Sequence, residues 1–404
     1  MPTKDPSSNW YTIDSDDLYV ASQLSGGTIT LGAVSYESLY LSYLVGTLVS
    51  VTTATITTTA TNTITATISP TNLVPVTEIV ASPVSHPVIV NIPSPLTIVP
   101  KDVSANDFDG DGHADLLWQN ADGTPAAWML NGASLVAGAN VGFNPGPSWH
   151  TKDTGDFNGD GKADILWQND DGTPAVWLMN GTSLTAGANI GFNPGPSWHI
   201  KGAADFDGDG KSDILWQNDD GAAAIWLMNG LSLTSGANVG SNPGPSWHAV
   251  AAADFNGDGK ADILWQNNDG QAAVWLMNGL SLISGSNVGT NPGPSWHAIG
   301  AGDFNGDGKA DILWQNTDGQ AAIWEMNGQS VLATSNVGLN PGAAWHAIAV
   351  ADFNGDGKAD IEWQNTDGTP AVWLMDGFNV ISGSNVGFDP GPNWHLTPGH
   401  DALV

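Results

Sequence analysis

Six copies of one acidic nine-residue loop are the clearest chemical feature of the sequence. The copy at residues 303–311 reads Asp-Phe-Asn-Gly-Asp-Gly-Lys-Ala-Asp, so oxygen-bearing side chains fall at its positions 1, 3, 5 and 9. Calcium takes about six to eight hard oxygen ligands in a flexible shell, and this alternation supplies them. The glycine at position 6 permits the sharp turn that wraps a loop around an ion. We therefore predict one calcium site per loop, about six structural ions in all.

The loops recur every 49 residues, beginning at Asp107, Asp156, Asp205, Asp254, Asp303 and Asp352. Position 7 holds Lys in five loops and His in the first, so we expect its backbone carbonyl, and not its side chain, to bind the ion. The predicted ligands are Asp107, Asp109, Asp111, His113 and Asp115; Asp156, Asn158, Asp160, Lys162 and Asp164; Asp205, Asp207, Asp209, Lys211 and Asp213; Asp254, Asn256, Asp258, Lys260 and Asp262; Asp303, Asn305, Asp307, Lys309 and Asp311; and Asp352, Asn354, Asp356, Lys358 and Asp360.

The predicted ions have a structural role. A saturated ligand shell leaves no open position for a substrate, and calcium is a poor Lewis acid beside zinc. We expect weak affinities, on the order of 10⁻⁴–10⁻³ M, as in extracellular modules. The first and third loops carry Asp109 and Asp207 where the others carry Asn, so the extra charge predicts tighter binding there.

Composition excludes several classes of function. The chain has 404 residues and a net charge of −32, and 20 of its 41 acidic residues lie in the six loops. All nine basic residues are Lys, and five sit in the loops, so we expect no basic patch and no binding to nucleic acid or to an anionic membrane.

There is no Cys, which excludes disulfides. The most apolar stretch, residues 39–51, is too short to span a bilayer, and residues 1–10 lack the apolar segment of a signal peptide.

The elements that position the loops are short strands. In the period from Trp296 to Ala344, strands are predicted at residues 296–303, 310–316, 321–326 and 331–338, with turns at Asp318-Gly319 and Asn327-Gly328. Apolar residues occur on both faces of these strands, as expected where each sheet is covered on both sides. Four strands in each 49-residue unit predict an all-β protein, a β-propeller with four-stranded blades.

The run Asp-Phe-Asn-Gly-Asp-Gly-Lys-Ala-Asp-Ile-Leu-Trp-Gln-Asn at residues 303–316 resembles the FG-GAP/VCBS repeat family of bacterial surface and secreted proteins. The integrin α-subunit propeller is a more distant relative. The resemblance covers roughly residues 98–401 and gives the domain division 1–97 and 98–404. It implies a calcium-bearing propeller outside the cytoplasm, commonly with seven blades.

The number of blades depends on the two ends of the repeat. Trp394 begins one further first strand after the sixth loop, and residues 98–106 supply the corresponding strand of the first repeat. We favour seven blades, the seventh being completed by N-terminal residues such as 76–91. The alternative is a six-bladed ring with the extra strand docked elsewhere.

Residues 1–97 form a separate β-rich segment with many Thr and Pro. A strand is predicted at Thr28–Leu31, and Thr occupies every odd position from 53 to 67, which is the period of a β-strand. So long a strand is unusual, and a hairpin turning near Thr61-Asn62 is at least as well supported. Three interpretations of this segment are open. It covers another surface of the protein, it pairs edge to edge with a second subunit, or its Thr hydroxyls form an array that orders water.

Trp and His recur in the repeat without forming a catalytic set. Two Trp series, starting at Trp118 and Trp128, are predicted to be core between blades. The series Trp149, Trp198, Trp247, Trp296, Trp345 and Trp394 precedes His near a rim and is the candidate ligand-binding surface. The His that follow it (150, 199, 248, 297, 346 and 395) are predicted to be hydrogen-bonded structural residues. No nucleophile–base spacing or phosphate loop appears, so we expect no enzyme.

The sequence therefore predicts a non-enzymatic, calcium-stabilised propeller that binds a glycan or protein surface ligand multivalently, as in adhesion. Weak calcium sites fill only outside the cytosol, so we expect an extracellular or cell-surface location on a bacterium. The alternative is a structural subunit of a filament or surface layer, assembled as a homo-oligomer through residues 1–97.

Overall fold

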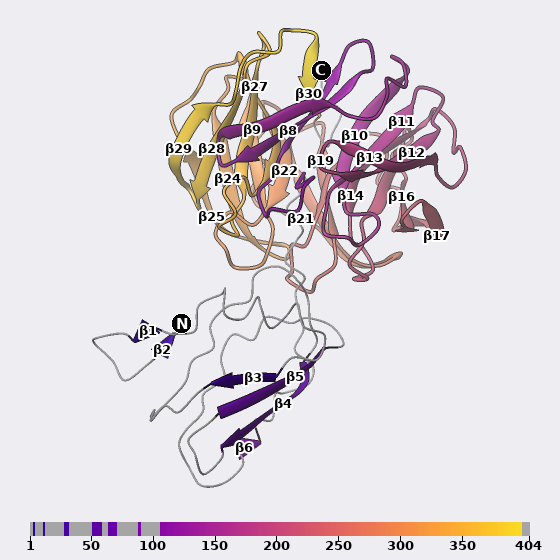
Figure 1. The fold of residues 1–404 in the computed structure, drawn as a ribbon. Helices are drawn as coiled ribbons and strands as arrows, with labels where there is room; N and C mark the ends of the chain where they lie inside the picture. Colours follow the sequence, from indigo (N-terminus) through magenta and orange to yellow (C-terminus); the bar gives the residue numbers. More distant parts are fainter. Residues whose placement is uncertain are drawn as a thin grey trace. The chain divides into compact units, whose positions relative to one another are not determined.

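The computed structural model describes residues 106–397 and six earlier strands at residues 3–4, 11–12, 28–31, 51–58, 64–70 and 88–89 (Figure 1). The chain divides into two compact units, Met1–Ile98 and Val99–Val404. Each unit is described by itself.

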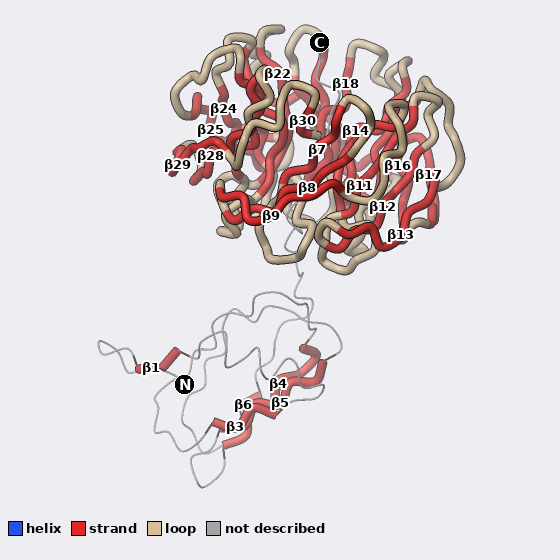
Figure 2. Tube along the Cα trace, turned by 45° about the horizontal axis from the view of Figure 1, so that its top comes forward, coloured by secondary structure: helices blue, strands red, loops and turns tan. Residues whose placement is uncertain are grey.

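The second unit is a six-bladed β-propeller, and each blade is a sheet of four strands (Figure 2). From the inner to the outer strand, blade 1 consists of β30 (Trp394–Leu396), β7 (Leu116–Asn120), β8 (Pro125–Asn131) and β9 (Ser134–Asn140); blade 2 of β10 (Trp149–Gly155), β11 (Asp164–Asn169), β12 (Pro174–Asn180) and β13 (Ser183–Asn189); blade 3 of β14 (Trp198–Ala204), β15 (Asp213–Asn218), β16 (Ala223–Asn229) and β17 (Ser232–Val239); blade 4 of β18 (Trp247–Ala253), β19 (Asp262–Asn267), β20 (Ala272–Asn278) and β21 (Ser281–Val288); blade 5 of β22 (Trp296–Gly302), β23 (Asp311–Asn316), β24 (Ala321–Asn327) and β25 (Ser330–Val337); and blade 6 of β26 (Trp345–Ala351), β27 (Asp360–Asn365), β28 (Pro370–Asp376) and β29 (Asn379–Asn385).

Blade 1 is assembled from the two ends of the repeat. β30 pairs antiparallel with β7, with Trp394 opposite Asn120 and Leu396 opposite Trp118. The last repeat thus supplies the inner strand of the first blade, while every other blade takes its four strands from one stretch of chain. This overlap joins the ends of the ring without leaving an unpaired strand edge at the seam.

The prediction of seven blades is therefore wrong, because β30 completes the first blade and does not begin another. In the stretch 76–91, the described part is β6 (Val88–Ile89), which pairs with β4 (Val51–Thr58) in the N-terminal unit. Of the inner strand expected at residues 98–106, the structure describes only Asn106, and β30 occupies the place beside β7.

The repeat gives every blade the same internal register. The four strands predicted for residues 296–344 match β22–β25 within one residue at each end. In blade 3, Trp198 lies opposite Asn218 and the register shifts between Ile200 and Gly202; the other complete inner strands shift at the equivalent place. A bulge of this kind increases the local twist, which suits the tightly packed centre of a propeller. Inner strands of neighbouring blades contact one another around the ring.

Tryptophan fills the space between blades. Each indole of the first series (Trp118, Trp167, Trp216, Trp265, Trp314 and Trp363) is 1% exposed. Trp167 of blade 2 packs with Phe108 and Leu117 of blade 1, so it lies in the interface between them. A Trp of the second series packs against each, as Trp177 does against Trp167, with the ring centroids 4.8 Å apart and the ring planes tilted by 51°. Because one indole buries about 150–250 Å², these pairs contribute much of the apolar surface that holds blades together, and the prediction of core for both series is confirmed.

The first unit contains a four-stranded sheet in the order β3-β5-β4-β6, and a two-stranded one formed by β1 (Thr3–Lys4) and β2 (Tyr11–Thr12). β3 (Thr28–Leu31) has the predicted bounds. β4 and β5 (Ile64–Pro70) pair antiparallel, with Thr58 opposite Ile64, so the alternating Thr segment is a hairpin and not one long strand. Its predicted turn at Thr61-Asn62 lies outside the described residues.

Among the described residues, no helix has the length and apolar character needed to cross a membrane.

Candidate functional site: six acidic loops and the opposite face

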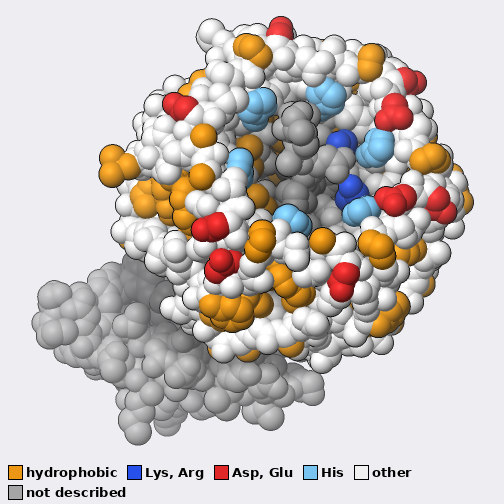
Figure 3. All heavy atoms as spheres, turned by 90° about the horizontal axis from the view of Figure 1, so that it is seen from above, with side chains coloured by type: hydrophobic (Ala, Val, Ile, Leu, Met, Phe, Trp, Pro, Cys, Tyr) orange, Lys and Arg blue, Asp and Glu red, His pale blue; other side chains and the backbone are white. Residues whose placement is uncertain are grey.

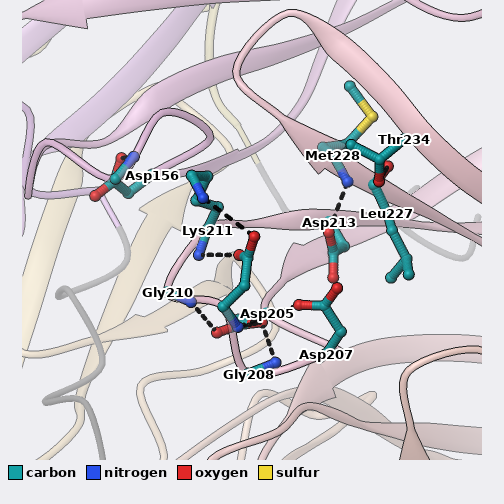
Figure 4. A network of polar contacts seen from close by, with 12 residues as sticks. Asp156, Asp205, Asp207, Gly208, Gly210, Lys211, Asp213, Leu227, Met228 and Thr234 are labelled. Atoms are coloured by element: carbon teal, nitrogen blue, oxygen red, sulfur yellow. Dashed lines mark hydrogen bonds and ion pairs between the residues drawn. The ribbon is translucent and has the colours of Figure 1, made fainter.

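Each acidic loop is folded around its first aspartate. In the third loop, Asp205 accepts hydrogen bonds from Gly208 N at 2.7 Å and Gly210 N at 2.8 Å, one on each carboxylate oxygen (Figure 4). Both glycines have φ +81°, a left-handed conformation in which a side chain would be strained. The other first-position aspartates accept the same two bonds, and the sequence repeat therefore reproduces one loop geometry six times.

The aspartate at position 9 ties the loop to its own blade. Asp213 accepts Phe206 N at 2.9 Å on one oxygen and Met228 N, on β16, at 2.8 Å on the other. Equivalent pairs of bonds occur in all six blades. These carboxylates are 0–1% exposed. The loop end, the second strand and the third strand are thus fixed by one buried side chain.

Carboxylates from separate loop positions meet in a common space. Oxygens of Asp205, Asp207 and Asp209 lie within 4.8 Å of one another, and so do those of Asp107, Asp109 and Asp115. Asp207 also faces Asp213 (Figure 4). The two clusters fall in the loops with Asp at position 3. Three of the four predicted side-chain positions are therefore brought together in each of these two loops (1, 3 and 9 in loop 1, and 1, 3 and 5 in loop 3), and an all-oxygen donor set of this kind is what a hard cation requires.

Burial makes the position-9 carboxylates expensive to ionise. Desolvation raises the pKa of Asp115 to about 8, and that of Asp164, Asp213, Asp262, Asp311 and Asp360 to about 7, although backbone hydrogen bonds oppose the shift. In the described propeller no Lys, Arg or His side chain bonds to these oxygens. A cation in the loop would supply the missing positive charge, so the residues fit a bound ion.

Four of the position-7 side chains are bonded to groups outside this space, whereas Lys211 pairs with a carboxylate of the cluster itself. Lys162, Lys260 and Lys358 reach the turn between the third and fourth strands of their own blade, at Asn180, Asn278 and Asp376, and Lys211 pairs with Asp209 at 3.1 Å. In the first loop, His113 Nδ1 lies 3.1 Å from Phe353 O. Binding by the position-7 carbonyls stays a prediction.

Consecutive loops are hydrogen-bonded to one another in a closed ring. The carbonyl of each first-position Asp accepts the position-8 amide of the next loop, as Asp107 O does from Ala163 N at 2.6 Å. The other five bonds are Ser212–Asp156, Ala261–Asp205, Ala310–Asp254, Ala359–Asp303 and Ala114–Asp352, the last of which joins loop 1 to loop 6. We call this side of the propeller the loop face.

The opposite side, which we call the Trp–His face, carries the hairpins between the second and third strands and the Pro-Gly connections between blades. At one such contact Gly123 (φ +96°) would place a Cβ 2.3 Å from Gly146 O, so only glycine fits. His side chains surround the mouth of the central channel on this face (Figure 3). The recurring Trp that precede them are half-buried and pack against the cores between blades.

Cavities on the Trp–His face recur at equivalent blade junctions. One of about 510 Å³ is lined by Asn120, Gly123, Pro147, Trp149 and His395, among others. A second, of about 170 Å³, is lined by the residues that correspond to these three repeats later, Asn267, Gly270, Pro294, Trp296 and His248. We call each such site a junction niche. It is made from the hairpin and inner-strand His of one blade and the Pro–Trp–His segment of the next.

The prediction that the recurring His are hydrogen-bonded is confirmed for three of the six, in the blades that carry Asp or Asn beside the His. His150 Nε2 lies 2.8 Å from Asp170, His199 Nε2 lies 2.8 Å from Asp219, and His248 Nε2 lies 2.7 Å from Asn268. The acceptor comes from the hairpin of the same blade, and blades 5, 6 and 1 carry Thr317, Thr366 and Ala121 at that position.

Sequence reasoning missed three features, of which the first two are departures from the repeat. Lys152 and Lys201 occupy a place in the inner strand where blades 4–6 have Val250, Ile299 and Ile348. Glu362 replaces a Leu of the second strand and is 1% exposed; its Oε1 has no hydrogen-bond partner among the described residues, and burial raises its pKa well above the usual value. The niches themselves could not be seen, because each joins two blades.

Comparison with known proteins supports the assignment of the repeats. The solved structure titled "Crystal structure of Nidogen/Laminin Complex" is similar over 70% of this chain and 95% of that one, at 12% identity and a TM-score of 0.41. No protein with a curated description matches the chain. The model of the FG-GAP-like repeat matches residues 107–167, 156–216, 205–265, 254–314 and 303–363, which together cover more than half of the sequence. The chain therefore belongs to the FG-GAP-like repeat family.

Proposed function

We propose that this protein is a calcium-stabilised, non-enzymatic propeller that binds a glycan or a protein surface ligand through its junction niches. The observation that carries the proposal is the recurrence of one cavity, with corresponding lining residues, three repeats apart. Because the repeats are nearly identical, the same niche is built at more than one junction, which suits a ligand with several copies of one recognised group.

Calcium is the ion that suits the loops. The donor atoms are carboxylate and amide oxygens on a glycine-hinged loop, which fits the large and flexible shell of calcium better than the strict octahedron of magnesium. The buried position-9 carboxylate needs a positive charge and has no cationic side chain in the described propeller. Residues at positions 1, 3, 5 and 9 hold the ion, which supplies charge compensation and rigidity to the loop.

Weak calcium sites favour action outside the cytoplasm, where free calcium is high enough to fill them. Metal binding is coupled to folding, so a chain that is destabilised without calcium becomes stable after it leaves the cell. This reasoning supports an extracellular or cell-surface location and a role in adhesion.

The niche has the features of a small-ligand site. It combines the half-buried face of Trp149 or Trp296 with His and hairpin polar groups at the mouth of the channel. The inner strands place six such junctions around one ring, so a ligand with several copies of the recognised group can engage more than one. Engagement of two niches raises the avidity without any new contact.

The test is binding to a broad panel of immobilised glycans, with the full chain in calcium and in chelator. We expect calcium-dependent binding that is weakened by His248→Ala, which opens the smaller niche, and unchanged by Ser232→Ala, at an exposed residue that begins β17 on the loop face. Absence of binding to every glycan and to every cell surface tried would contradict the proposal.

A second candidate function rests on the N-terminal unit. β4 has eight residues, but β6 covers only Thr55 and Ile56 along one of its edges within the described strands. An edge that is largely uncharged and only partly covered favours pairing with another chain. Assembly into a filament or surface layer would follow, and electron microscopy of the full chain tests it; a strictly monomeric protein at high concentration contradicts it.

A further inference from the structure

The second Trp series is covered by a phenylalanine in blades 1, 2 and 3. The ring of Phe192 lies against Trp226 of blade 3, with the ring centroids 4.8 Å apart and the ring planes tilted by 45°. The equivalent pairs are Phe143 with Trp177 and Phe388 with Trp128. Each covering Phe lies in the connection that precedes the blade, and the three indoles beneath are 5–6% exposed. The indole surface of these three blades is therefore sealed by the chain itself.

The second-series indoles of blades 4, 5 and 6 lack this cover. Ser241 and Thr290 stand at the phenylalanine position before blades 4 and 5, and Leu339, which is 89% exposed, stands there before blade 6. The indoles concerned are only partly buried, and they are Trp275, Trp324 and Trp373. Among the described residues, the ring contact of each is with the first-series Trp of its own blade. Half of the propeller thus exposes an aromatic surface that the other half covers.

The backbone passes the covered and the uncovered indoles in the same way. A Cβ on Gly191 would lie 2.6 Å from Cζ3 of Trp226, and a Cβ on Gly240 would lie 2.4 Å from Cζ3 of Trp275. Both glycines are left-handed, with φ +57° and +61°. The residue that follows is Phe at the covered junction and Ser at the uncovered one. The space beside Trp275 is therefore the one that a phenyl ring occupies beside Trp226.

The outer strands of blades 4, 5 and 6 also present aliphatic side chains to solvent. The third residue of these strands is Ile283, Leu332 or Ile381, each 59–62% exposed, and Val136 continues the series in blade 1. Blades 2 and 3 have Thr at this position, and its hydroxyl donates to a carbonyl of the same blade. Exposed apolar side chains confined to one part of a ring of repeats favour a protein-binding surface.

We propose that the uncovered indoles of blades 4 and 5, Trp275 and Trp324, each bind an aromatic side chain of a protein partner. The occupant is inferred from the molecule itself, because a phenyl ring fills the equivalent place in three other blades. Ile283 and Leu332 add apolar surface for the residues that flank this side chain in the partner. None of these residues lines a junction niche, so the surface is separate from the site of the proposed function.

The test compares two capped peptides, Gly-Gly-Phe-Gly-Gly and Gly-Gly-Ala-Gly-Gly, with the calcium-loaded full chain. Line broadening in the NMR spectrum of the peptide measures binding. Because an aromatic pair adds to the free energy of apolar burial, we expect the Phe peptide to bind at least about fivefold more tightly. Methyl β-glucoside is the third probe, since a pyranose ring also has a flat apolar face. Displacement of the Phe peptide by a lower concentration of the glucoside would overturn the inference in favour of a sugar.

Variants locate the site by exchanging the two kinds of junction. Ser241→Phe combined with Thr290→Phe installs the cover of blades 1–3 and is expected to abolish the preference for the Phe peptide. Ser241→Ala combined with Thr290→Ala is the matched control, because it changes the same positions without adding a ring, and the preference should remain. Phe192→Ser uncovers Trp226 and is expected to add a binding site. Melting curves establish that each variant is folded.

The outcomes separate this inference from the proposed function. Equal affinity for the Phe and Ala peptides overturns the inference, and so does a covered double variant that keeps the preference. Phe192→Ser without additional binding has the same meaning, because it would show that an uncovered indole does not suffice. None of these results changes the prediction for His248→Ala, which tests the junction niches alone.

Discussion

The loop face and the Trp–His face are made from the same six repeats, but only the loop face is uniform. Every acidic loop has Asp at positions 1, 5 and 9 and Gly at positions 4 and 6, and the same hydrogen bonds recur in each. On the Trp–His face the hairpin residue at the position that bonds His150 in blade 2 is Ala121, Asp170, Asp219, Asn268, Thr317 or Thr366. Uniform contacts suit a scaffold, whereas variation from blade to blade creates sites with different chemistry.

The largest expected effect is a pH dependence of the unfolding free energy, to which all six position-9 carboxylates of the loop face contribute. Burial raises the pKa of these carboxyls to about 7–8 in the folded protein, above their ordinary value of 3.8, so between these pH values the folded state binds more protons than the unfolded state. The unfolding free energy of the calcium-free protein should therefore fall as pH rises from about 4 to about 8. In excess calcium the unfolding free energy should instead rise over the same pH range, because the ionised carboxylate is the form that binds calcium.

Thermal melting at a series of pH values, in chelator and in calcium, measures this effect. Parallel pH profiles in the two conditions would show that the buried carboxylates are not where calcium binds.

A single position-9 substitution should have the next largest effect. Asp213→Asn keeps the volume of the side chain but turns an NH₂ group toward a backbone N–H, so one buried hydrogen bond is lost and two donors face each other. We expect a loss of about 2–5 kcal/mol in urea unfolding with calcium present. Asp219→Asn on the Trp–His face of the same blade is the control; its side chain is 66% exposed, and a change within about 1 kcal/mol is expected. An equal loss of unfolding free energy in the two variants would contradict the distinction between the loop face and the Trp–His face.

Glu362 is a place where the scaffold departs from its own repeat. The other second strands carry Leu117, Leu166, Leu215, Leu264 and Leu313 there, and the cluster of buried apolar residues around this seam joins blades 6 and 1. Glu362→Leu should stabilise the propeller by about 1–4 kcal/mol, because it replaces a buried carboxyl, whose Oε1 has no hydrogen-bond partner among the described residues, by an apolar side chain of similar size.

The reciprocal variant, Leu313→Glu, should destabilise by a comparable amount. An unchanged or lower melting temperature for Glu362→Leu would mean that Glu362 has a compensating contact.

The smallest effect concerns the one ligand position that varies on the loop face. Asn305→Asp adds a carboxylate at position 3, and we expect the calcium affinity of that loop to rise about threefold to tenfold. Asp207→Asn should lower the affinity of loop 3 by a similar factor. Calcium titration followed by calorimetry measures both, and shifts in the same direction would contradict the assigned role of position 3.

Much of the fold could be predicted from the sequence, because the 49-residue period repeats the strand and turn signals of one blade. The strands of residues 296–344 follow from the alternation of apolar residues and from Asp318-Gly319 and Asn327-Gly328. The number of blades could not be predicted from the sequence. The 49-residue period reveals an extra inner strand at Trp394 but not the strand with which it pairs.

Of the two kinds of candidate site, the acidic loops could be predicted from the sequence and the junction niches could not. The loop ligands are close together in sequence, so their spacing identifies them directly. A niche requires Pro147 and Trp149 of one blade to meet His395 of another, which only the closed ring provides. Lys152 and Lys201 were visible as departures from the repeat, but a count of basic residues over the whole chain concealed their proximity.

The central claim is that calcium in the six loops holds the propeller together. The most direct test is the melting temperature of the full chain at pH 8 in chelator and in about 10 mM calcium, with magnesium at the same concentration as the control. We predict a large increase with calcium that continues with the logarithm of its concentration, and little change with magnesium. The same melting temperature in chelator and in calcium would contradict the account.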